Sequence, residues 1–581
     1  MPIVVSILER SADALLRAAE RAAPDADALE LRLDALDAAA VEALAPRLRA
    51  LGKPVIAAVH GAEGFGTFAG PLEARFELLR AAAHAGAAFV DVDARFAAAF
   101  GPAPAGARRI VSHHEKEGTP PELAALFDRV ERAAASGDVV KVVTHAACAE
   151  DGLRVLSELR ARVARDAGRE RTAFCSGERG AFTRVLAPLA GARFTYAAPA
   201  DGARTAPGQL DARALRAALA SARTLRPPVA VWAGSALAAT RWFAVLGRPV
   251  AHSWSPRLHG AVFRALARDA VYVACEPDDV AHFLALAREL PFEGFSITAP
   301  FKTDALRAAS EVAEDAAALG AANTIVRTES GWRASNTDAP AVRAALASAC
   351  FSASKGTQSS IRAGGPVSAS GTEAHGAALG TTSARGAPLG TTSLHGARAL
   401  VVGAGGAARA AVWALVGAGA EVAVHARRGA EADTLASAFG ARSLTADAVV
   451  RERFDVLVHA TPAGSRASAD ACAVPVEWLS PGMRVLDAVY RPAETELLRR
   501  ARARGCVAVP GTTWFALQAR LQAALFVGRV GAERVDAKAL EAALAAELES
   551  LSREESEPDA TRARAAGSDR AAPRASDGGV P

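Results

Sequence analysis

From Met1 to Ala222, short runs of β-branched and apolar residues alternate with longer stretches in which apolar positions recur at helical spacing. This alternation predicts repeated strand–helix units whose strands lie parallel in one sheet. Eight such units in a segment of this size are typical of a (β/α)8 barrel, which carries its active site at the carboxyl ends of the strands. The predicted strands are residues 3–8, 29–33, 55–59, 89–92, 109–112, 139–143, 172–174 and 193–196.

A second α/β pattern begins at Trp242, after a proline-containing joint at residues 226–228. It stops near Ala349, where a segment rich in Gly, Ser, Thr and Ala repeats the letters LGTTS and cannot form a core. Order resumes at Ala399 with a strand, a glycine turn and a helix, which are typical of a Rossmann-like domain. The final residues are charged and lack periodicity, which predicts a disordered tail.

We therefore predict an α/β chain in which the barrel precedes a two-domain α/β enzyme with a C-terminal Rossmann-like domain. The last helices should return to the first of these two domains, which makes that domain discontinuous in sequence. The predicted boundaries are 1–222 for the barrel, 240–349 for the first domain of the second enzyme, 350–396 for the low-complexity insert, 397–517 for the Rossmann-like domain, 518–548 for the returning helices and 549–581 for the tail.

The composition agrees with several globular domains, because the 581 residues are 51% hydrophobic and 22% charged. The formal net charge is +4 and the basic residues are scattered, so nucleic acid is not an expected partner. The six cysteines lie far apart without a CxxC pair, which argues against a metal site and against disulfides. The sequence has no basic amino-terminal region and no apolar run of about 18 residues, so we expect a cytoplasmic protein without a membrane segment.

One lysine, Lys141, lies within the otherwise apolar strand predicted at residues 139–143. Burial there disfavours the charged amine, so we expect a lowered pKa and an amine able to attack a ketone. A side chain that extends from the strand end to solvent explains this segment equally well. Polar groups at the ends of other strands favour the first interpretation.

These polar groups follow several different predicted strands. Glu30, Arg32 and Asp34 alternate with leucines, so all three project to one side of their strand. His114 ends another strand and offers an imidazole for proton transfer. Their joint occurrence favours an active site over unrelated surface positions. A guanidinium and hydrogen-bonding groups follow the seventh and eighth strands, at Arg184, Thr205 and Gln209.

Residues 1–222 resemble type I 3-dehydroquinate dehydratase through the motifs ELRLD, SHHE, DVVKVV, TR and TAPGQ. The resemblance implies that Lys141 forms a Schiff base with the substrate ketone, and that the protonated imine is the electron sink for dehydration. It also implies that His114 transfers the protons. The substrate-binding residues that it implies are Glu30, Arg32, Arg184, Thr205 and Gln209, with Arg184 as the partner of a carboxylate.

Two positions depart from this family pattern. His60 stands at the end of the third strand, where the family usually has arginine, and Glu63 arrives one residue early. Both belong to the predicted substrate site. The departures leave open a second interpretation, in which the barrel is a catalytically impaired binding module.

The second α/β pattern carries its own polar groups. Ser253 and Ser255 are two residues apart, so both hydroxyls can face one ligand carboxylate if the loop is extended. A helix cap would explain only one of them. Lys302 follows a strand, and Asn323 and Asp338 lie beyond it.

Together these segments resemble shikimate dehydrogenase through GxPxxHSxSPxxH, TxPFK, GAxNT and NTD. The resemblance implies a two-domain α/β dehydrogenase in which Lys302 and Asp338 handle the proton as hydride moves. Ser296 stands where the family generally has asparagine. The substrate-binding residues that the resemblance implies are Ser253, Ser255, Thr298, Asn323, Tyr490 and Gln518.

The Rossmann-like segment begins with a glycine turn between a strand and a helix, where backbone amides can approach a pyrophosphate. The next strand ends in Arg427 and Arg428, where an NAD enzyme would carry an acid, so we expect NADP(H). The predicted cofactor-binding residues are Gly403, Ala404, Gly405, Gly406, Ala407, Arg427, Arg428, Thr461 and Gly511.

The sequence thus predicts a bifunctional shikimate-pathway enzyme that dehydrates 3-dehydroquinate and then reduces 3-dehydroshikimate to shikimate with NADPH. Its expected partners are these small molecules, and neither site needs a metal. Besides the impaired barrel, the alternatives include a quinate dehydrogenase that uses NAD, which Arg427 disfavours.

Overall fold

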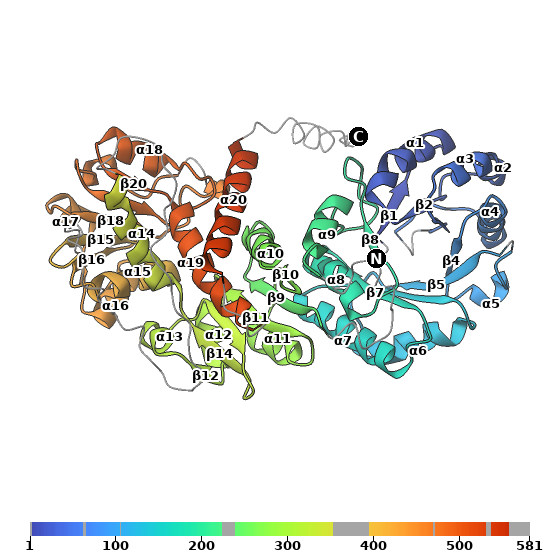
Figure 1. Cartoon of the computed structure of the whole chain (residues 1–581), viewed down its shortest axis with the longest axis horizontal. Helices are drawn as coiled ribbons and strands as arrows, with labels where there is room; N and C mark the ends of the chain where they lie inside the picture. Colours follow the sequence, from blue (N-terminus) through green and yellow to red (C-terminus); the bar gives the residue numbers. More distant parts are fainter. Residues whose placement is uncertain are drawn as a thin grey trace, which may run out of the picture.

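The structure is a computed structural model that describes residues 3–61, 65–104, 106–222, 239–352, 394–468, 471–529 and 536–556. In Figure 1 the barrel, coloured blue to teal, lies beside two α/β domains coloured green to red. Most of the predicted low-complexity insert and of the predicted tail lies outside the described residues. Within the described part of the chain, no helix is both long and apolar enough to cross a membrane.

The first eight strands form one parallel sheet, in the order β7-β6-β5-β4-β3-β2-β1-β8. A backbone hydrogen bond of 2.6 Å from Arg193 N to Arg171 O joins the entrance of β8 to β7. The predicted (β/α)8 barrel is confirmed, with its helices around the strands (Figure 1). The strands are β1 Ile3–Leu8, β2 Ala28–Arg32, β3 Val55–Ala58, β4 Phe89–Asp93, β5 Arg108–His114, β6 Val139–His145, β7 Arg171–Ser176 and β8 Thr195–Ala197. The helices are α1 Ala12–Ala22, α2 Ala38–Ala43, α3 Ala45–Ala50, α4 Leu72–His84, α5 Ala97–Phe100, α6 Leu123–Ala133, α7 Ala149–Arg165, α8 Ala181–Leu186 and α9 Ala212–Leu219.

Side chains alternate between the two sides of each barrel strand. One set is largely apolar and packs against the helices, while the polar residues of the pocket belong to the other set, which faces the barrel interior. The register brings the polar residues of neighbouring strands together, because Ser6 lies opposite Glu30 and Ser112 lies opposite Lys141. The barrel therefore gathers polar groups that are far apart in the sequence.

The second domain is built on a six-stranded mixed sheet in the order β10-β9-β11-β13-β14-β12. Strand β13 runs antiparallel to its neighbours β11 and β14, whereas β9 and β10 pair in parallel. The strands are β9 Arg241–Leu246, β10 Ala270–Cys275, β11 Phe292–Ile297, β12 Glu311–Val312, β13 Thr324–Arg327 and β14 Trp332–Ser335. The helices are α10 Ser255–Ala265, α11 Val280–Ala287, α12 Lys302–Ala308 and α13 Glu314–Leu319.

The last two helices return to this second domain, where Phe526 and Leu551 belong to a core cluster that also contains Phe243 of β9. Their bounds differ from the predicted ones. The first helix begins inside the segment predicted as Rossmann-like, and the second continues past residue 548, where Glu554 pairs with Arg257 of α10 at 2.6 Å. The two helices are α19 Gly511–Val527 and α20 Ala537–Ser556.

The third domain has a parallel six-stranded sheet in the order β17-β16-β15-β18-β19-β20. This is the order of a doubly wound Rossmann-like sheet, which places a crevice at the switch point between β15 and β18. The predicted Rossmann-like fold is therefore confirmed. The strands are β15 Arg398–Val402, β16 Glu421–His425, β17 Arg442–Ser443, β18 Val456–His459, β19 Arg484–Asp487 and β20 Val507–Val509. The helices are α14 Asp338–Ser352, α15 Gly406–Val416, α16 Gly429–Phe439, α17 Ala446–Val450 and α18 Glu496–Ala503.

The barrel and the second domain are in direct contact. Glu150, at the start of α7, is 4% exposed and accepts hydrogen bonds from the backbone of Asp278 and Asp279, at 3.0 and 2.9 Å. Arg179 adds an ion pair of 2.8 Å to the Asp278 carboxylate. Figure 1 shows α7 beside α11, which begins directly after this acidic segment. Residues that follow β6 and β7, at the carboxyl end of the barrel, thus hold the second domain.

Two candidate active sites

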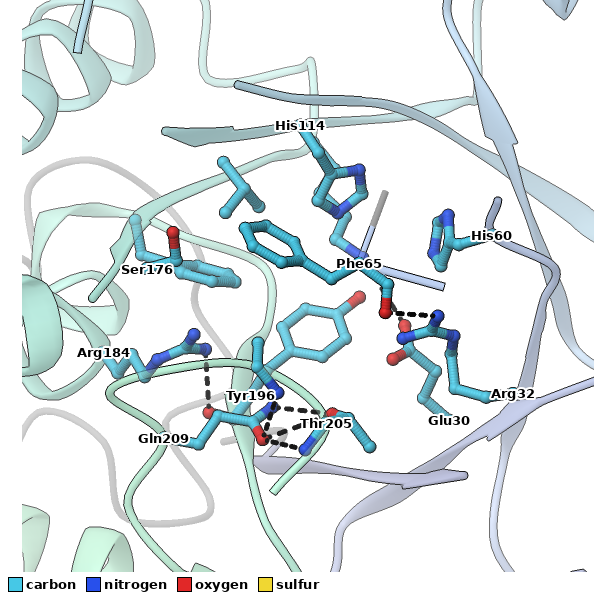
Figure 2. A pocket seen from close by; sticks show the side chains of 14 residues that line it. Glu30, Arg32, His60, Phe65, His114, Ser176, Arg184, Tyr196, Thr205 and Gln209 are labelled. Carbon is cyan, nitrogen blue, oxygen red and sulfur yellow. Dashed lines mark hydrogen bonds and ion pairs between the residues drawn. The ribbon is translucent and has the colours of Figure 1, made fainter. Parts of the chain in front are cut away.

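A pocket with an empty volume of about 410 Å³ opens at the carboxyl end of the barrel strands. Figure 2 shows side chains from several strands converging on it. Eight of the nine residues predicted for this site line the pocket, and the ninth, Glu63, lies outside the described residues. The eight are Glu30, Arg32, His60, His114, Lys141, Arg184, Thr205 and Gln209.

Lys141 of β6 is almost completely buried in this pocket, with 4% of its side chain exposed. Its Nζ lies 2.8 Å from Oδ2 of Asp91 and 3.5 Å from Oε2 of Glu30. Burial by itself lowers the pKa of Lys141, but the charges around the amine, chiefly that of Asp91, outweigh burial and raise the pKa. The predicted lowering of this pKa is therefore wrong, because the carboxylates that surround the amine come from distant strands.

Asp91 of β4 is the closest partner of the amine, and the sequence prediction missed it. Burial raises the pKa of Asp91, although Lys141 opposes this effect. Ser112 donates a hydrogen bond of 2.5 Å to its Oδ1. A carboxylate with a raised pKa beside a charged amine can accept the proton of that amine, which leaves the neutral form that attacks a ketone. The only signal for Asp91 in the sequence is that it is an acidic residue within a predicted apolar strand.

His60 and His114 form a pair of imidazoles in the same pocket. Their ring centroids are 4.9 Å apart in an edge-to-face arrangement. Burial lowers the pKa of both side chains well below the usual 6.5, and the nearby cations Arg32 and Lys141 lower it further. Both imidazoles are therefore neutral at pH 7, and a neutral imidazole can accept a proton.

The two predicted arginines of this pocket differ in what they bind. Arg32 forms a bidentate pair with Asp34, at 2.6 and 3.2 Å, which neutralises its charge. Arg184 is 1% exposed, and no carboxylate of the described residues pairs with it. One of its nitrogens donates to the backbone oxygen of Tyr196 at 3.3 Å, its Nε has no partner, and burial lowers its pKa to about 10. An unpaired buried guanidinium on a pocket wall favours a ligand with a carboxylate.

The loop after β8 folds around the side chain of Gln209. Its Oε1 accepts a hydrogen bond of 2.8 Å from Thr205 N. Thr205 Oγ1 donates in turn to Ser6, at 2.9 Å, and Ser6 donates to Glu30 at 2.6 Å. Gly208 has a φ of +71°, and a side chain there would lie 2.1 Å from a backbone oxygen of the loop after β7. The motif TAPGQ thus holds the Thr205 hydroxyl at the pocket wall.

The second candidate site lies where the second and third domains meet. Lys302 Nζ is 2.6 Å from Asp338 Oδ2, with 18% and 10% of the two side chains exposed. A side chain at Gly406, the first residue of α15, would lie 3.0 Å from Cδ of Lys302. The predicted lysine therefore lies against the glycine turn that is predicted to bind the cofactor.

A buried hydrogen-bond network supports this pair. Gln522 of α19 donates to the backbone oxygen of Asn323 at 2.8 Å and accepts from Ser296 at 2.7 Å. The Asn323 amide donates to Thr337 Oγ1 at 2.9 Å, one residue before Asp338. The sequence prediction missed Gln522, whose only signal is a polar residue in a largely apolar helix. Ser296, at the position where the resembled family has asparagine, is anchored by this glutamine.

The predicted serine pair lies together beside a tyrosine. Ser253 donates to Ser255 at 3.2 Å, and the Tyr490 hydroxyl hydrogen bonds with Ser253. Three hydroxyls that meet at one loop suit a ligand carboxylate or hydroxyl. The remaining predicted substrate residues are Thr298, which follows β11, and Gln518, which is half-buried on α19.

The glycine turn after β15 leaves the backbone open to a ligand. Gly403 has a φ of +126°, and a side chain there would lie 2.7 Å from Ala460 O. Gly405 precedes α15, and nothing described lies within 4 Å of where its side chain would be. Backbone amides at such a helix start can bind a pyrophosphate. The predicted Ala404 and Ala407 belong to the same turn.

Two exposed arginines follow β16, where a Rossmann-like domain reads the ribose of its dinucleotide. Arg428 pairs with Glu431 at 2.7 Å, whereas Arg427 has no acidic partner among the described residues. A free guanidinium at this place fits a ribose phosphate.

The last two predicted cofactor residues also lie at the carboxyl ends of the strands. Thr461 follows β18, and its Oγ1 is 2.5 Å from Nε2 of His459, whose Nδ1 is 2.8 Å from Asp487. Gly511 begins α19, where a side chain would lie 2.3 Å from Val489 O. No group of three or more metal-ligating side chains occurs in the described part of the chain.

Comparison with known proteins adds independent findings. The family model of type I 3-dehydroquinase matches residues 3–226, and that of the shikimate dehydrogenase substrate binding domain matches residues 245–325. Shikimate dehydrogenase (NADP(+)) of Anaeromyxobacter sp. (strain K) is 35% identical over 321 residues, which cover 52% of this chain and 96% of that protein. The chain belongs to the shikimate dehydrogenase family.

This shikimate dehydrogenase region follows a type I 3-dehydroquinase domain, and similar proteins include one with both names. The bifunctional 3-dehydroquinate dehydratase/shikimate dehydrogenase of Arabidopsis thaliana, described as chloroplastic, is 28% identical over 516 residues, 87% of this chain and 78% of that protein. The crystal structure of shikimate 5-dehydrogenase from Thermus thermophilus, in complex with NADP(H) and shikimate, is 31% identical. It covers 53% of this chain and 100% of its own, with a TM-score of 0.42.

Proposed function

We propose that the chain catalyses two consecutive reactions: dehydration of 3-dehydroquinate to 3-dehydroshikimate in the barrel, and reduction of that product to shikimate with NADPH in the second site. The observation that carries this proposal is a pair of separate lysine–carboxylate contacts, Lys141 with Asp91 at 2.8 Å and Lys302 with Asp338 at 2.6 Å. Lys141, Lys302 and Asp338 are residues that the two family resemblances imply, and Asp91 is added by the contact itself. The similarity to the bifunctional Arabidopsis protein supports the same pairing of activities.

The barrel residues support dehydration through an imine. Asp91 takes a proton from Lys141, and the neutral amine adds to the ketone carbon of the substrate. Loss of water from this adduct forms a C=N bond, whose protonated nitrogen draws electrons from the adjacent C–H bond. His114 accepts that proton and returns it to the hydroxyl that leaves as water. Hydrolysis of the imine then releases the product and restores Lys141.

The unpaired Arg184 supplies the positive charge for the substrate carboxylate. Arg32 is already paired with Asp34, so its contribution is a set of oriented hydrogen bonds and not a free charge. We assign the remaining polar contacts to the substrate hydroxyls. The described residues that make them are Glu30, His60, Thr205 and Gln209, and a role for Glu63 stays a prediction.

The second site supports reduction of a carbonyl group. The glycine turn and the exposed Arg427 fit NADPH, which supplies the hydride when it is bound. Lys302, held by Asp338 and lying against that turn, donates the proton to the carbonyl oxygen as it gains charge. Ser253, Ser255, Thr298, Asn323, Tyr490 and Gln518 bind the substrate.

The alternatives are less favoured by these observations. An impaired barrel does not explain why the pocket keeps a buried amine, a neutral imidazole and an unpaired Arg184 together. A quinate dehydrogenase that uses NAD does not explain the free Arg427 at the ribose position. The cytoplasmic location and the absence of nucleic-acid partners stay predictions.

Borohydride added with 3-dehydroquinate should leave a covalent adduct on Lys141, because it reduces the imine to a stable amine. Mass spectrometry of the intact chain and of its peptides measures the added mass and its position. Lys141→Ala should gain no mass while it still oxidises shikimate. A parent chain that gains no mass would show that the barrel is silent.

The dehydration rate should persist below pH 6.5. The pKa of His114 is held well below 6.5 by burial, so its imidazole stays neutral and able to accept a proton as the pH falls past that value. The measurement is the pH profile of kcat/KM for 3-dehydroquinate, whose acidic limb reports the free enzyme. An acidic limb centred at or above pH 6.5 contradicts the assignment of His114 as the base.

Arg427→Ala should lower kcat/KM for NADP by about 10- to 150-fold, because a hydrogen bond to a charged group contributes about 1.5–3 kcal/mol. Turnover with NAD should change little. Arg428→Ala is the matched control, since Arg428 is already paired with Glu431 and should have a smaller effect. Equal use of NADP and NAD by the parent chain would refute the coenzyme assignment.

A further inference from the structure

Tyr196 of β8 is a buried tyrosine whose hydroxyl makes no well-formed hydrogen bond with the described residues, although the Lys141 amine interacts with it. Its exposed fraction is 3%, and no described residue pairs with its oxygen in hydrogen-bonding geometry. Tyr272, which is equally buried in the second domain, donates to Ser296 at 2.5 Å. Because buried hydroxyls are seldom left without a well-formed hydrogen bond, one in this state on a pocket wall points to a ligand.

The ring of Tyr196 lies between the amine and the arginine of the dehydratase pocket. Lys141 Nζ faces the ring, 4.4 Å from its centroid. Burial raises the pKa of Tyr196, and the charge of Lys141 and its contact with the hydroxyl oppose this effect. The backbone oxygen of Tyr196 accepts from Arg184 at 3.3 Å. Figure 2 shows the hydroxyl directed into the pocket, away from Arg184 and toward the side where Glu30 and Arg32 lie.

Both parts of this side chain can act on a bound ketone. Burial raises the pKa of Tyr196, so the phenol keeps its proton and can donate a hydrogen bond. The electron-rich face of the ring favours a cation at the Lys141 nitrogen, and a protonated imine places its charge at that same atom. The ring and the hydroxyl therefore favour the same bound state.

We propose that Tyr196 is a substrate-binding residue of the dehydratase site, whose hydroxyl hydrogen bonds with the substrate hydroxyl on the carbon next to the imine carbon. This inference rests on the dehydration proposed above. In the imine of 3-dehydroquinate the carbon that bears this hydroxyl is two bonds from the imine nitrogen, which lies over the ring of Tyr196. The carboxylate lies across the substrate ring, on the side that Arg184 binds. A hydroxyl directed away from Arg184 thus meets the imine end of the substrate.

The test compares the parent chain with Tyr196→Phe, which keeps the ring and removes the hydroxyl. We expect kcat/KM for dehydration to fall about tenfold, the usual size for one lost hydrogen bond. Borohydride should still trap the imine on Lys141, because the amine and the ring remain. For the parent, kcat/KM should fall by a similar factor when 3-dehydroquinate is replaced by an analogue without the hydroxyl next to the ketone. For Tyr196→Phe, the same replacement should not lower kcat/KM further.

Thermal unfolding provides the control for structure. Tyr196→Phe removes an unpaired hydroxyl and should not lower Tm, whereas Tyr272→Phe removes a bonded hydroxyl and should. Equal kcat/KM for the parent and Tyr196→Phe would overturn the inference. The inference would also be overturned if the analogue lowered kcat/KM by the same factor in Tyr196→Phe as in the parent. If Tyr196→Phe folds poorly, the test uses the parent chain alone. Equal kcat/KM of the parent for 3-dehydroquinate and for the analogue would exclude the proposed contact. A parent that traps no imine would instead overturn the proposed dehydration.

Discussion

The contact between the Lys141 amine and the carboxylates of Asp91 and Glu30 is the interaction on which the barrel site depends. Burial of a single charge would be costly, and the two carboxylates make it possible to keep the amine inside the barrel. The same carboxylates keep the amine protonated in the resting state. The proposed dehydration therefore begins with a proton transfer from this lysine to a neighbour, for which Asp91 has a raised pKa.

The second site uses a related contact in a more open place. Lys302 and Asp338 come from the starts of two helices and lie against the glycine turn of the third domain. A proton donor in this position can serve a carbonyl group held between substrate and cofactor domains. Glu150, at the start of α7, and Arg179 join the barrel to the domain that carries Lys302, so the two sites belong to one connected structure.

Much of the fold was predictable because strand and helix periodicities are local properties of the sequence. The strand at Ile3–Leu8 was predicted with its observed bounds, and the Rossmann-like turn was recognised from its glycines. Contacts across the barrel were not predictable in the same way. Asp91 and Tyr196 each stand in an apolar strand, and only the closed barrel brings them to Lys141. The pKa of Lys141 was predicted in the wrong direction for the same reason.

The central claim is that one chain carries both reactions on two separate lysines. The most direct measurement follows NADPH consumption in a single mixture that starts from 3-dehydroquinate. The parent chain should consume NADPH. Lys141→Ala alone and Lys302→Ala alone should each consume none, and an equal mixture of the two variants should restore NADPH consumption. Failure of the parent chain, or consumption by Lys141→Ala alone, would contradict the account.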